Sequence, residues 1–289
     1  MSDYRIGVIG GSGLYQMAGL VVKETRVVET PFGAPSDPYV LGEIDGRGVV
    51  FLARHGAGHR LMPSELNYRA NLYGFKSLGI DRLISLSAVG SMKLQYEPTH
   101  IVVVDQFIDR TRHRADTFFG DGLVAHVSLA DPVCPHLVPL FADAAGDAGA
   151  VVHEGGTYLC MEGPQFSTRA ESNLYRSWGA DVIGMTNLTE ARLAREAEIC
   201  YATLALVTDY DCWHEEVADV SVTSVLEVLE QNARTAQAVI VEIVRRLPPE
   251  APSGCPCCKA LEHALITRRD RISREALERL RPLVGRVLD

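Results

Sequence analysis

An uncharged apolar run that stops abruptly in acid, at residues 200–213, most constrains the fold of this chain. Residues 200–207 read Cys-Tyr-Ala-Thr-Leu-Ala-Leu-Val, which suits a strand buried on both faces of a parallel sheet. Asp209 and Asp211 follow at once, where such a strand reaches the surface. Open α/β sheets bind their ligands at this edge. The two carboxylates therefore predict a binding or catalytic site.

The segment before this run extends the same site. Its pattern predicts two elements, a buried strand at residues 180–185 and a helix at 188–197. Asn187 and Glu190 can form a capping box at the start of the helix. We expect strand, helix and strand to form one right-handed βαβ unit. Its parallel strands would place Met185 and Thr186 at the same sheet edge as the two acids.

Length and composition favour a single large α/β domain. The chain has 289 residues, of which 47% are hydrophobic, enough to bury a full core. We expect a central mixed, largely parallel twisted sheet flanked by helices over residues 1–247. No signal peptide or membrane-length apolar run is visible, so we expect a cytoplasmic protein without a membrane partner. The net charge of −9 argues against a nucleic-acid surface.

Three further strand ends carry groups that suit an anion. The strands are predicted at residues 4–9, 49–53 and 82–86. A glycine turn with Ser12 follows the first, Arg54 and His55 follow the second, and Ser87 follows the third. Backbone amides, hydroxyls and a planar guanidinium are typical phosphate donors. Their agreement predicts a phosphate site, although Arg54 and His55 alone could equally be a surface arginine and a structural histidine.

The glycine turn at residues 10–13 does not predict a dinucleotide site. The dinucleotide fingerprint would need a glycine at Gln16 and a helix directly after it, whereas residues 21–30 look strand-like. The remaining expected elements are a helix at 64–77, a strand at 101–104, a long loop to His126, a helix from Cys134 to about Ala148 and a strand at 156–161. Phe166 follows that strand and could stack on a flat ligand or simply pack.

These residues belong to motifs that mark a known family. The motifs are Gly10–Gly13, Thr30–Gly33, Ala53–Gly56, Asn67–Asn71, Asp105–Thr111, Glu162–Pro164, Arg169–Ser172, Gly184–Thr186 and Thr208–Trp213. With them the chain resembles, over roughly residues 5–245, the 5′-methylthioadenosine phosphorylases of the trimeric purine nucleoside phosphorylase family. The resemblance implies the nucleoside phosphorylase fold and phosphorolysis of S-methyl-5′-thioadenosine to adenine and 5-methylthioribose 1-phosphate.

The resemblance also implies roles for individual residues. Phosphate would be held by Ser12, Arg54, His55 and Ser87, with Thr186 between phosphate and ribose. The nucleoside would be lined by Ala88, Met185, Phe166 and Ser167, with Asp209 and Asp211 at N7 and the 6-amino edge of the purine. The 5′-methylthio pocket would be formed by Val222, Val225 and Leu226, and completed by His126 of a neighbouring subunit. A homotrimer is expected, with pairing into hexamers left open.

The chemistry agrees with these residue types. Cleavage of an N-glycosidic bond develops positive charge on the ribosyl carbon and negative charge on the purine, so phosphate and a proton donor at N7 stabilise opposite ends. A buried aspartic acid can supply that proton. Inorganic phosphate is the co-substrate, and neither a metal nor an organic cofactor is expected. Adenosine and 5′-deoxyadenosine stay open as side substrates.

Other functions remain as alternatives. A nucleosidase that uses water, or a non-catalytic purine-binding protein, would have no use for the predicted phosphate site beside the purine site. A 6-oxopurine phosphorylase would favour an amide where Asp209 or Asp211 offers a carboxylate.

The tail, residues 248–289, begins with a proline-rich linker after a predicted helix at 222–246. Cys255 and Cys258 have the spacing of a redox pair or half a zinc site, but no second half with matching spacing is visible in the sequence. Some archaeal relatives form disulfides from a cysteine pair at this end; free thiols are the simpler expectation, as for Cys134, Cys160, Cys200 and Cys212.

A final helix from Ser273 to about Leu280, which could continue past Pro282, is expected to dock on its own subunit, with a neighbouring subunit as the alternative.

Overall fold

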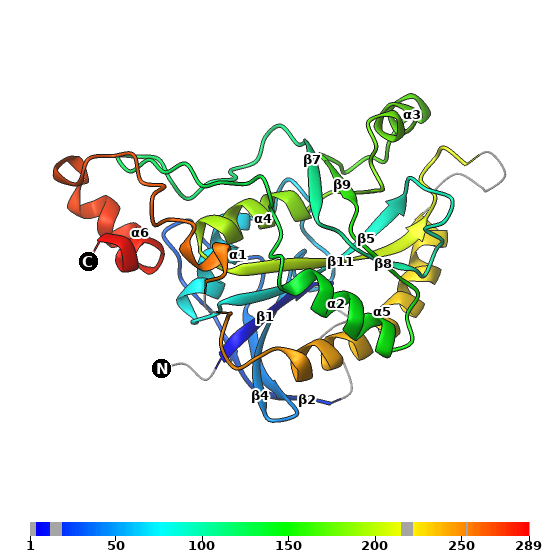
Figure 1. The fold of residues 1–289 in the computed structure, drawn as a ribbon, viewed down its shortest axis with the longest axis horizontal. Coiled ribbons are helices and arrows are strands. Elements are labelled where there is room, and N and C mark those ends of the chain that lie inside the picture. The colour runs from blue at the N-terminus through cyan, green and yellow to red at the C-terminus, as the bar shows by residue number, and fades with distance from the viewer. Residues whose placement is uncertain (1–3, 12–18, 215–221, 253, 289) are drawn as a thin grey trace.

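One mixed, twisted sheet forms the centre of the computed structural model, which describes residues 4–11, 19–214, 222–252 and 254–288 (Figure 1). Eleven strands make up this sheet in the described residues. They are β1 (Tyr4–Gly10), β2 (Leu20–Arg26), β3 (Tyr39–Ile44), β4 (Arg47–Ala53), β5 (Arg82–Ser91), β6 (Ile101–Val103), β7 (Gln106–Arg110), β8 (Val152–Glu154), β9 (Thr157–Met161), β10 (Val182–Gly184) and β11 (Cys200–Asp209).

The middle of the sheet is parallel. Strands β4, β1, β5 and β11 lie side by side in that order and run in the same direction. Strands β2 and β3 extend one side as antiparallel neighbours, and β6 pairs antiparallel with β11. The expected fold class is therefore confirmed. Among the described residues, no helix is both long and apolar enough to cross a bilayer.

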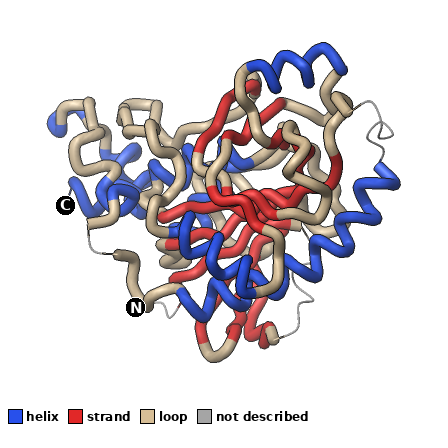
Figure 2. The backbone as a smooth tube through the Cα atoms, turned by 45° about the vertical axis from the view of Figure 1, so that its right-hand side comes forward, coloured by secondary structure: helices blue, strands red, loops and turns tan. Residues whose placement is uncertain are grey.

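Helices cover both faces of the sheet, as the tube view shows (Figure 2). They are α1 (Tyr68–Ser77), α2 (Leu137–Asp147), α3 (Arg169–Ser177), α4 (Asn187–Glu196), α5 (Val222–Arg246) and α6 (Arg274–Leu288), with short 3-10 turns η2 (Pro256–Lys259) and η3 (Arg269–Arg271). In β4, Val49 and Phe51 face the cluster beneath α2 and α5, whereas Val50 and Leu52 face the one beneath α1, α4 and α6. Burial on both faces explains why these strands are continuously apolar.

The predicted parallel βαβ unit is wrong in one respect. Strand β10 runs antiparallel to β5, with Val182 opposite Ser91 and Ile183 opposite Gly90, whereas β11 runs parallel to β5. Strands β10 and β11 are therefore antiparallel to each other. The reason is that β10 pairs in parallel with β9, so its direction is set by that neighbour rather than by α4.

Two predicted helix starts also differ from the structure. Helix α1 begins at Tyr68 rather than at residue 64, because the side chain of Asn67 caps it by accepting a hydrogen bond from the Ala70 amide at 3.2 Å. Helix α4 begins at Asn187 and has no capping box, since Thr186 is its N-cap residue and makes no side-chain cap bond. A capping box forms instead at α3, between Thr168 and Glu171.

Strand boundaries differ where polar residues continue a strand. Strand β5 extends through Ser91, beyond the predicted end at residue 86. Sequence reasoning missed β3, β7, β8 and α3. Strand β8 is too short to leave a pattern, while β7 carries Asp109 and Arg110, which made this segment resemble a loop.

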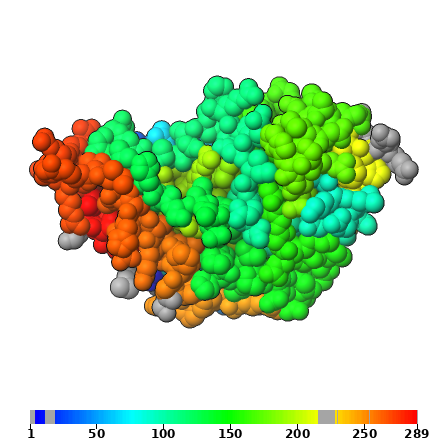
Figure 3. Space-filling model, turned by 45° about the horizontal axis from the view of Figure 1, so that its top comes forward, coloured from blue at the N-terminus to red at the C-terminus, as the bar shows by residue number. Residues whose placement is uncertain are grey.

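The tail returns to the main body of its own chain, as expected for α6. Leu280 and Leu283 of this helix are buried in the same cluster as α1, and the hydroxyl of Tyr73 donates to the Arg279 carbonyl at 3.1 Å. The buried Arg82 side chain holds the linker by donating to the carbonyl of Pro249 at 2.9 Å. Helix α6 continues through Pro282 to Leu288. The tail, in orange and red, covers one end of the molecule (Figure 3).

A glycine in α1 provides a test of how tightly this helix packs on β3. A Cβ at Gly74 would lie 2.1 Å from the hydroxyl oxygen of the fully buried Tyr39. We expect Gly74→Ala to destabilise the protein by about 1–3 kcal/mol through overpacking. Gly146→Ala in α2 is the matched control, because a Cβ there meets no atom within 4 Å and should stabilise the helix by about 0.5–1 kcal/mol. Urea unfolding of both variants measures the difference, and equal stabilities would contradict this packing.

Candidate active site

A pocket of about 660 Å³ opens where the sheet is interrupted beside β5. Strand β11 pairs with β5 along residues Arg82 to Gly90. On the opposite edge of β5, pairing with β1 ends at Ser85 and pairing with β10 begins only at Gly90. Ser87, Ala88 and Val89 therefore face the pocket from an edge of β5 that no strand of the described residues covers.

Nine of the residues proposed for the site from the sequence line this one pocket. They are Arg54, His55, Ser87, Ala88, Phe166, Met185, Thr186, Asp209 and Asp211. The antiparallel direction of β10 does not separate them: the end of β10 turns back along β5 toward Val89 and Ala88, so Met185 and Thr186 still approach the acids at the end of β11.

The two acids are oriented by an irregular end of β11. The register of β11 against β5 shifts between Val207 and Asp209, and Asp211 has a φ of 51°, in the left-handed region. The Asp209 carboxylate accepts hydrogen bonds from the Asp211 amide at 2.8 Å and the Thr208 hydroxyl at 2.6 Å. Gly90 leaves room for it, because a Cβ there would lie 2.9 Å from Asp209 Oδ1.

Burial affects the protonation of both acids. Removal from water raises the pKa of Asp209 above its ordinary value, and the neighbouring charge of Asp211 acts in the same direction. Burial also raises the pKa of Asp211. The pair is therefore set to hold a proton at a higher pH than free aspartic acids would.

Arg54 is anchored by a buried ion pair that the sequence did not reveal. Its guanidinium donates through Nε and Nη2 to both carboxylate oxygens of Glu190, with Nη2 to Oε2 at 3.1 Å. Their side chains are 3% and 0% exposed. Burial opposes the charge, but Glu190 outweighs it, so the pKa of Arg54 lies above its ordinary value. Glu190 was predicted to cap α4; its carboxylate faces the sheet instead.

Further polar side chains complete the partners of Glu190. The Ser85 and Tyr201 hydroxyls donate to Glu190 Oε2 at 2.8 and 3.1 Å. Asn187 donates through Nδ2 to the same Ser85 and Tyr201 oxygens, each at 3.0 Å. These bonds join β4, β5, β11 and α4 beneath the pocket.

His55 is held as a neutral ring. Burial, with the nearby charge of Arg54, lowers the pKa of His55 to about 4. Its Nδ1 lies 2.8 Å from the Leu61 carbonyl oxygen, which can only accept, so Nδ1 carries the hydrogen and Nε2 is an acceptor. His59 stacks on His55 with ring centroids 4.2 Å apart.

The hydroxyl and aromatic groups of the pocket remain accessible to a ligand. Ser87 Oγ makes only long contacts, at 3.3 Å to the Ala88 carbonyl and 3.4 Å to Tyr158. The Phe166 side chain is 47% exposed and lines the pocket mouth. Both can therefore engage a bound molecule without breaking a strong internal bond.

Several residues proposed from the sequence lie elsewhere or outside the described part of the chain. Ser167 does not line the pocket, although its carbonyl accepts from the Cys212 thiol at 3.3 Å. His126 lines a different cavity, near His263 and Arg195. Ser12 and the side chains of Val222, Val225 and Leu226 lie outside the described residues.

Other lining residues were missed by sequence reasoning. His59, Met62, Thr208 and Ala233 also border the pocket. The four-residue spacing of His55 and His59 was a signal for the first of these. Thr208 opens the motif Thr208–Trp213, although no role was assigned to it, and nothing in the sequence pattern singled out Met62 or Ala233.

Comparison with known proteins gives consistent matches over nearly the whole chain. The family described as the Phosphorylase superfamily matches residues 5–245. An S-methyl-5′-thioadenosine phosphorylase of Geobacter sulfurreducens is 60% identical over 281 residues, covering 97% of this chain and 98% of the relative. One from Koribacter versatilis is 57% identical, covering 98% of this chain and 96% of the relative.

Solved structures agree with these relatives. A methylthioadenosine phosphorylase from an antarctic soil metagenomic library superimposes with a TM-score of 0.93 at 50% identity, covering 98% of this chain and 99% of that one. A Schistosoma mansoni methylthioadenosine phosphorylase in complex with adenine gives a TM-score of 0.82 at 35% identity, covering 86% and 93% of the two chains.

A double-mutant cycle tests the ion pair beneath the pocket. Arg54→Met and Glu190→Leu should each cost about 3–5 kcal/mol, because each leaves the other charge buried and unpaired. The double variant should lose less stability than the sum of the two single losses, by at least about 1 kcal/mol. The exposed pair Arg234 and Glu230 is the control, with expected coupling of about 0.3–0.5 kcal/mol. Urea unfolding measures all variants, and additive effects at Arg54 and Glu190 would count against a coupled pair.

Proposed function

The chain belongs to the phosphorylase superfamily, and we propose that it cleaves S-methyl-5′-thioadenosine with phosphate to give adenine and 5-methylthioribose 1-phosphate. The resemblance seen in the sequence is thereby confirmed at the level of the family. The observation that carries the proposal is the convergence of anion donors and a buried acid pair in one pocket of the sheet.

The phosphate end of the proposed site is formed by strand ends. Ser87 and Thr186 supply hydroxyls, and Ser12 is expected to add another. The Nη1 atom of Arg54 donates one of its two hydrogens to the Leu86 carbonyl at 2.7 Å. The structure gives the other Nη1 hydrogen no partner among the described residues, so we assign it to phosphate. Because Glu190 balances the charge of Arg54, Arg54 acts on phosphate mainly as an oriented hydrogen-bond donor. Neutral His55 can accept from a protonated phosphate oxygen through Nε2.

The purine end rests on the two acids. We assign Asp209 to N7, because a carboxyl with a raised pKa can hold the proton that the leaving purine needs. Asp211 then accepts from the 6-amino group, with Phe166 bordering the base. Loss of the purine leaves positive charge on the ribosyl carbon, which the phosphate on the other side stabilises before it forms the new C–O bond.

The sugar lies between these ends in this arrangement. Met185 and Ala88 would contact the ribose, and Val222, Val225 and Leu226 of α5 would enclose the 5′-methylthio group. The described part of the wall near α5 is apolar, with Leu206, Ala233 and Ala236 lining the pocket. Such a wall favours a thioether over a 5′-hydroxyl, which would lose its hydrogen bonds there.

The assembly and setting follow from the same proposal. We infer a homotrimer in which His126 of one subunit completes the 5′ pocket of its neighbour, which accounts for its distance from the pocket of its own chain. The reaction uses inorganic phosphate as co-substrate and no organic cofactor. Cytoplasmic location and the absence of nucleic-acid or membrane partners are part of the proposal, as are adenosine and 5′-deoxyadenosine as slower substrates.

Product analysis tests the reaction type. Incubation with methylthioadenosine should release adenine only when phosphate is present, and the sugar product should be 5-methylthioribose 1-phosphate. Mass spectrometry of the sugar with and without phosphate distinguishes the outcomes. Release of free methylthioribose without phosphate would identify a nucleosidase, and no release at all would identify a binding protein.

Substitution of each acid tests the purine site. Asp209→Asn should lower kcat on methylthioadenosine, because the amide cannot deliver a proton to N7. Asp211→Asn should narrow the preference for methylthioadenosine over methylthioinosine by roughly tenfold, since a mispaired buried group costs about 1–3 kcal/mol and an amide can turn its donor toward O6. Steady-state kinetics on both nucleosides measure this, and unchanged turnover and preference in both variants would place the purine elsewhere.

A further inference from the structure

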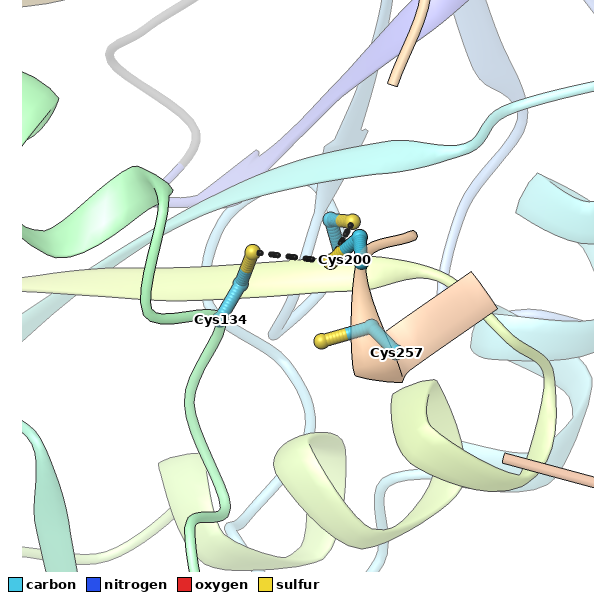
Figure 4. Close-up of side chains that lie close together, drawn as sticks. Cys134, Cys200 and Cys257 are labelled. Carbon is cyan, nitrogen blue, oxygen red and sulfur yellow. Dashed lines mark hydrogen bonds between the residues drawn. The ribbon is translucent and has the colours of Figure 1, made fainter. Parts of the chain in front are cut away.

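Four cysteines from three distant parts of the chain meet in the core. Cys134 lies just before α2, Cys200 is the first residue of β11, and Cys255 and Cys257 come from the tail at η2. All four are buried, and their Sγ atoms lie within 4.8 Å of one another. Figure 4 shows Cys134, Cys200 and Cys257 close together, each on a different segment of the chain. Two tail cysteines thus meet two cysteines of the core, although the tail pair suspected from the sequence was Cys255 with Cys258.

The spacing of the sulfur atoms fits a tetrahedral metal site. Zinc–sulfur bonds of about 2.3 Å place the ligand sulfurs of a regular tetrahedron about 3.8 Å apart. The Sγ atoms of Cys134 and Cys255 are 3.7 Å apart, and those of Cys200 and Cys255 are 3.5 Å apart. Small shifts of the side chains would therefore place all four sulfurs at the distances that the ion requires.

We propose that Cys134, Cys200, Cys255 and Cys257 bind one structural zinc ion. Four sulfur ligands in a tetrahedral arrangement favour zinc among the common divalent ions. Binding converts four thiols into four thiolates coordinated to Zn²⁺, and four protons pass to solvent. The ligand set is closed, so the ion has no open position for substrate, and none of the four residues lines the phosphorylase pocket.

The ligand set differs from the spacing suggested by the sequence. Cys258 lies 3.8 Å from Cys200 but is only half-buried and falls outside the mutually close set of four. The two tail ligands are therefore Cys255 and Cys257, a Cys-x-Cys pair. The Arg195 guanidinium is near enough to Cys257 to interact electrostatically, which offsets part of the negative charge of a zinc–tetrathiolate group.

The ion would fasten the tail to the sheet. Helix α5 ends at Arg246, and Cys255, just before η2, lies against Cys200 at the start of β11. Zinc would link Cys200 to Cys134 on one side and to Cys255 on the other, and each link closes a loop of more than fifty residues. Such a closure stabilises the folded state because it lowers the conformational entropy of the unfolded chain. The expected effect is on stability and metal content, with little change in kcat.

The first experiment uses the unmodified full chain, purified without a metal-affinity step and without chelators. Elemental analysis should find about one zinc per chain. Alkylation after denaturation, with chelator and without reductant, should modify all seven cysteines. Titration with an organomercurial should release the zinc as the thiolates react. Absence of zinc, or a disulfide among these four cysteines, would overturn the proposal.

Variants define the ligands. Cys257→Ser should lose most of its zinc and lower the thermal midpoint, while Cys258→Ser should keep the zinc and so exclude the alternative tail pair. Cys160→Ser is the control for loss of a buried thiol elsewhere in the core. If Cys257→Ser does not fold, replacement of zinc by Co²⁺ in the unmodified chain should give the absorption bands of a tetrahedral cobalt thiolate. Retention of full zinc by a folded Cys257→Ser, or absence of those bands, would refute this ligand set.

Discussion

The buried ion pair between Arg54 and Glu190 is the interaction on which the site depends. Taking both charges out of water is costly, and only well-formed hydrogen bonds to the remaining oxygen and nitrogen atoms offset that cost. Ser85 and Tyr201 donate such bonds to Glu190, and Asn187 in turn donates to both of their hydroxyl oxygens. The ion pair therefore fixes the end of β4 and the first turns of α4 in one arrangement. Thr186 and Met185 precede that turn, so their positions follow from it.

The pocket is an interruption of the sheet rather than a cavity between domains. Strands β1 and β10 approach the same edge of β5 from opposite directions and stop short of each other. The stretch of β5 between them includes Ser87 and Ala88, and residues at the ends of β4, β9, β10 and β11 also line the pocket. Such a gap supplies polar backbone and side-chain groups on rigid elements, which suits the binding of a compact anion and a sugar in fixed orientation.

The sequence predicted the buried strands well and their directions less well. Strands β1, β4 and β11 are apolar on both faces, and this pattern reports burial without reference to neighbours. The direction of β10 depends on pairing with β9, which no local pattern records. Asn187 and Glu190 have the spacing of a capping box, yet the Glu190 carboxylate forms an ion pair with Arg54, 136 residues away in the sequence. Nine residues that line the pocket could be named from the sequence and its family resemblance. The meeting of Cys134 and Cys200 with the tail cysteines, in contrast, required the folded chain.

The position of the tail has a consequence for how the protein is made. Leu247, Cys255 and Cys257 belong to the same buried cluster as Ile6 and Val8 of the first strand, and α6 covers α1. These segments leave the ribosome well after the strands and the helix that they cover. Until they emerge, the nascent sheet has an uncovered apolar flank, and the surroundings of β1 are incomplete. Completion of this core therefore waits for chain that is synthesised more than two hundred residues after β1.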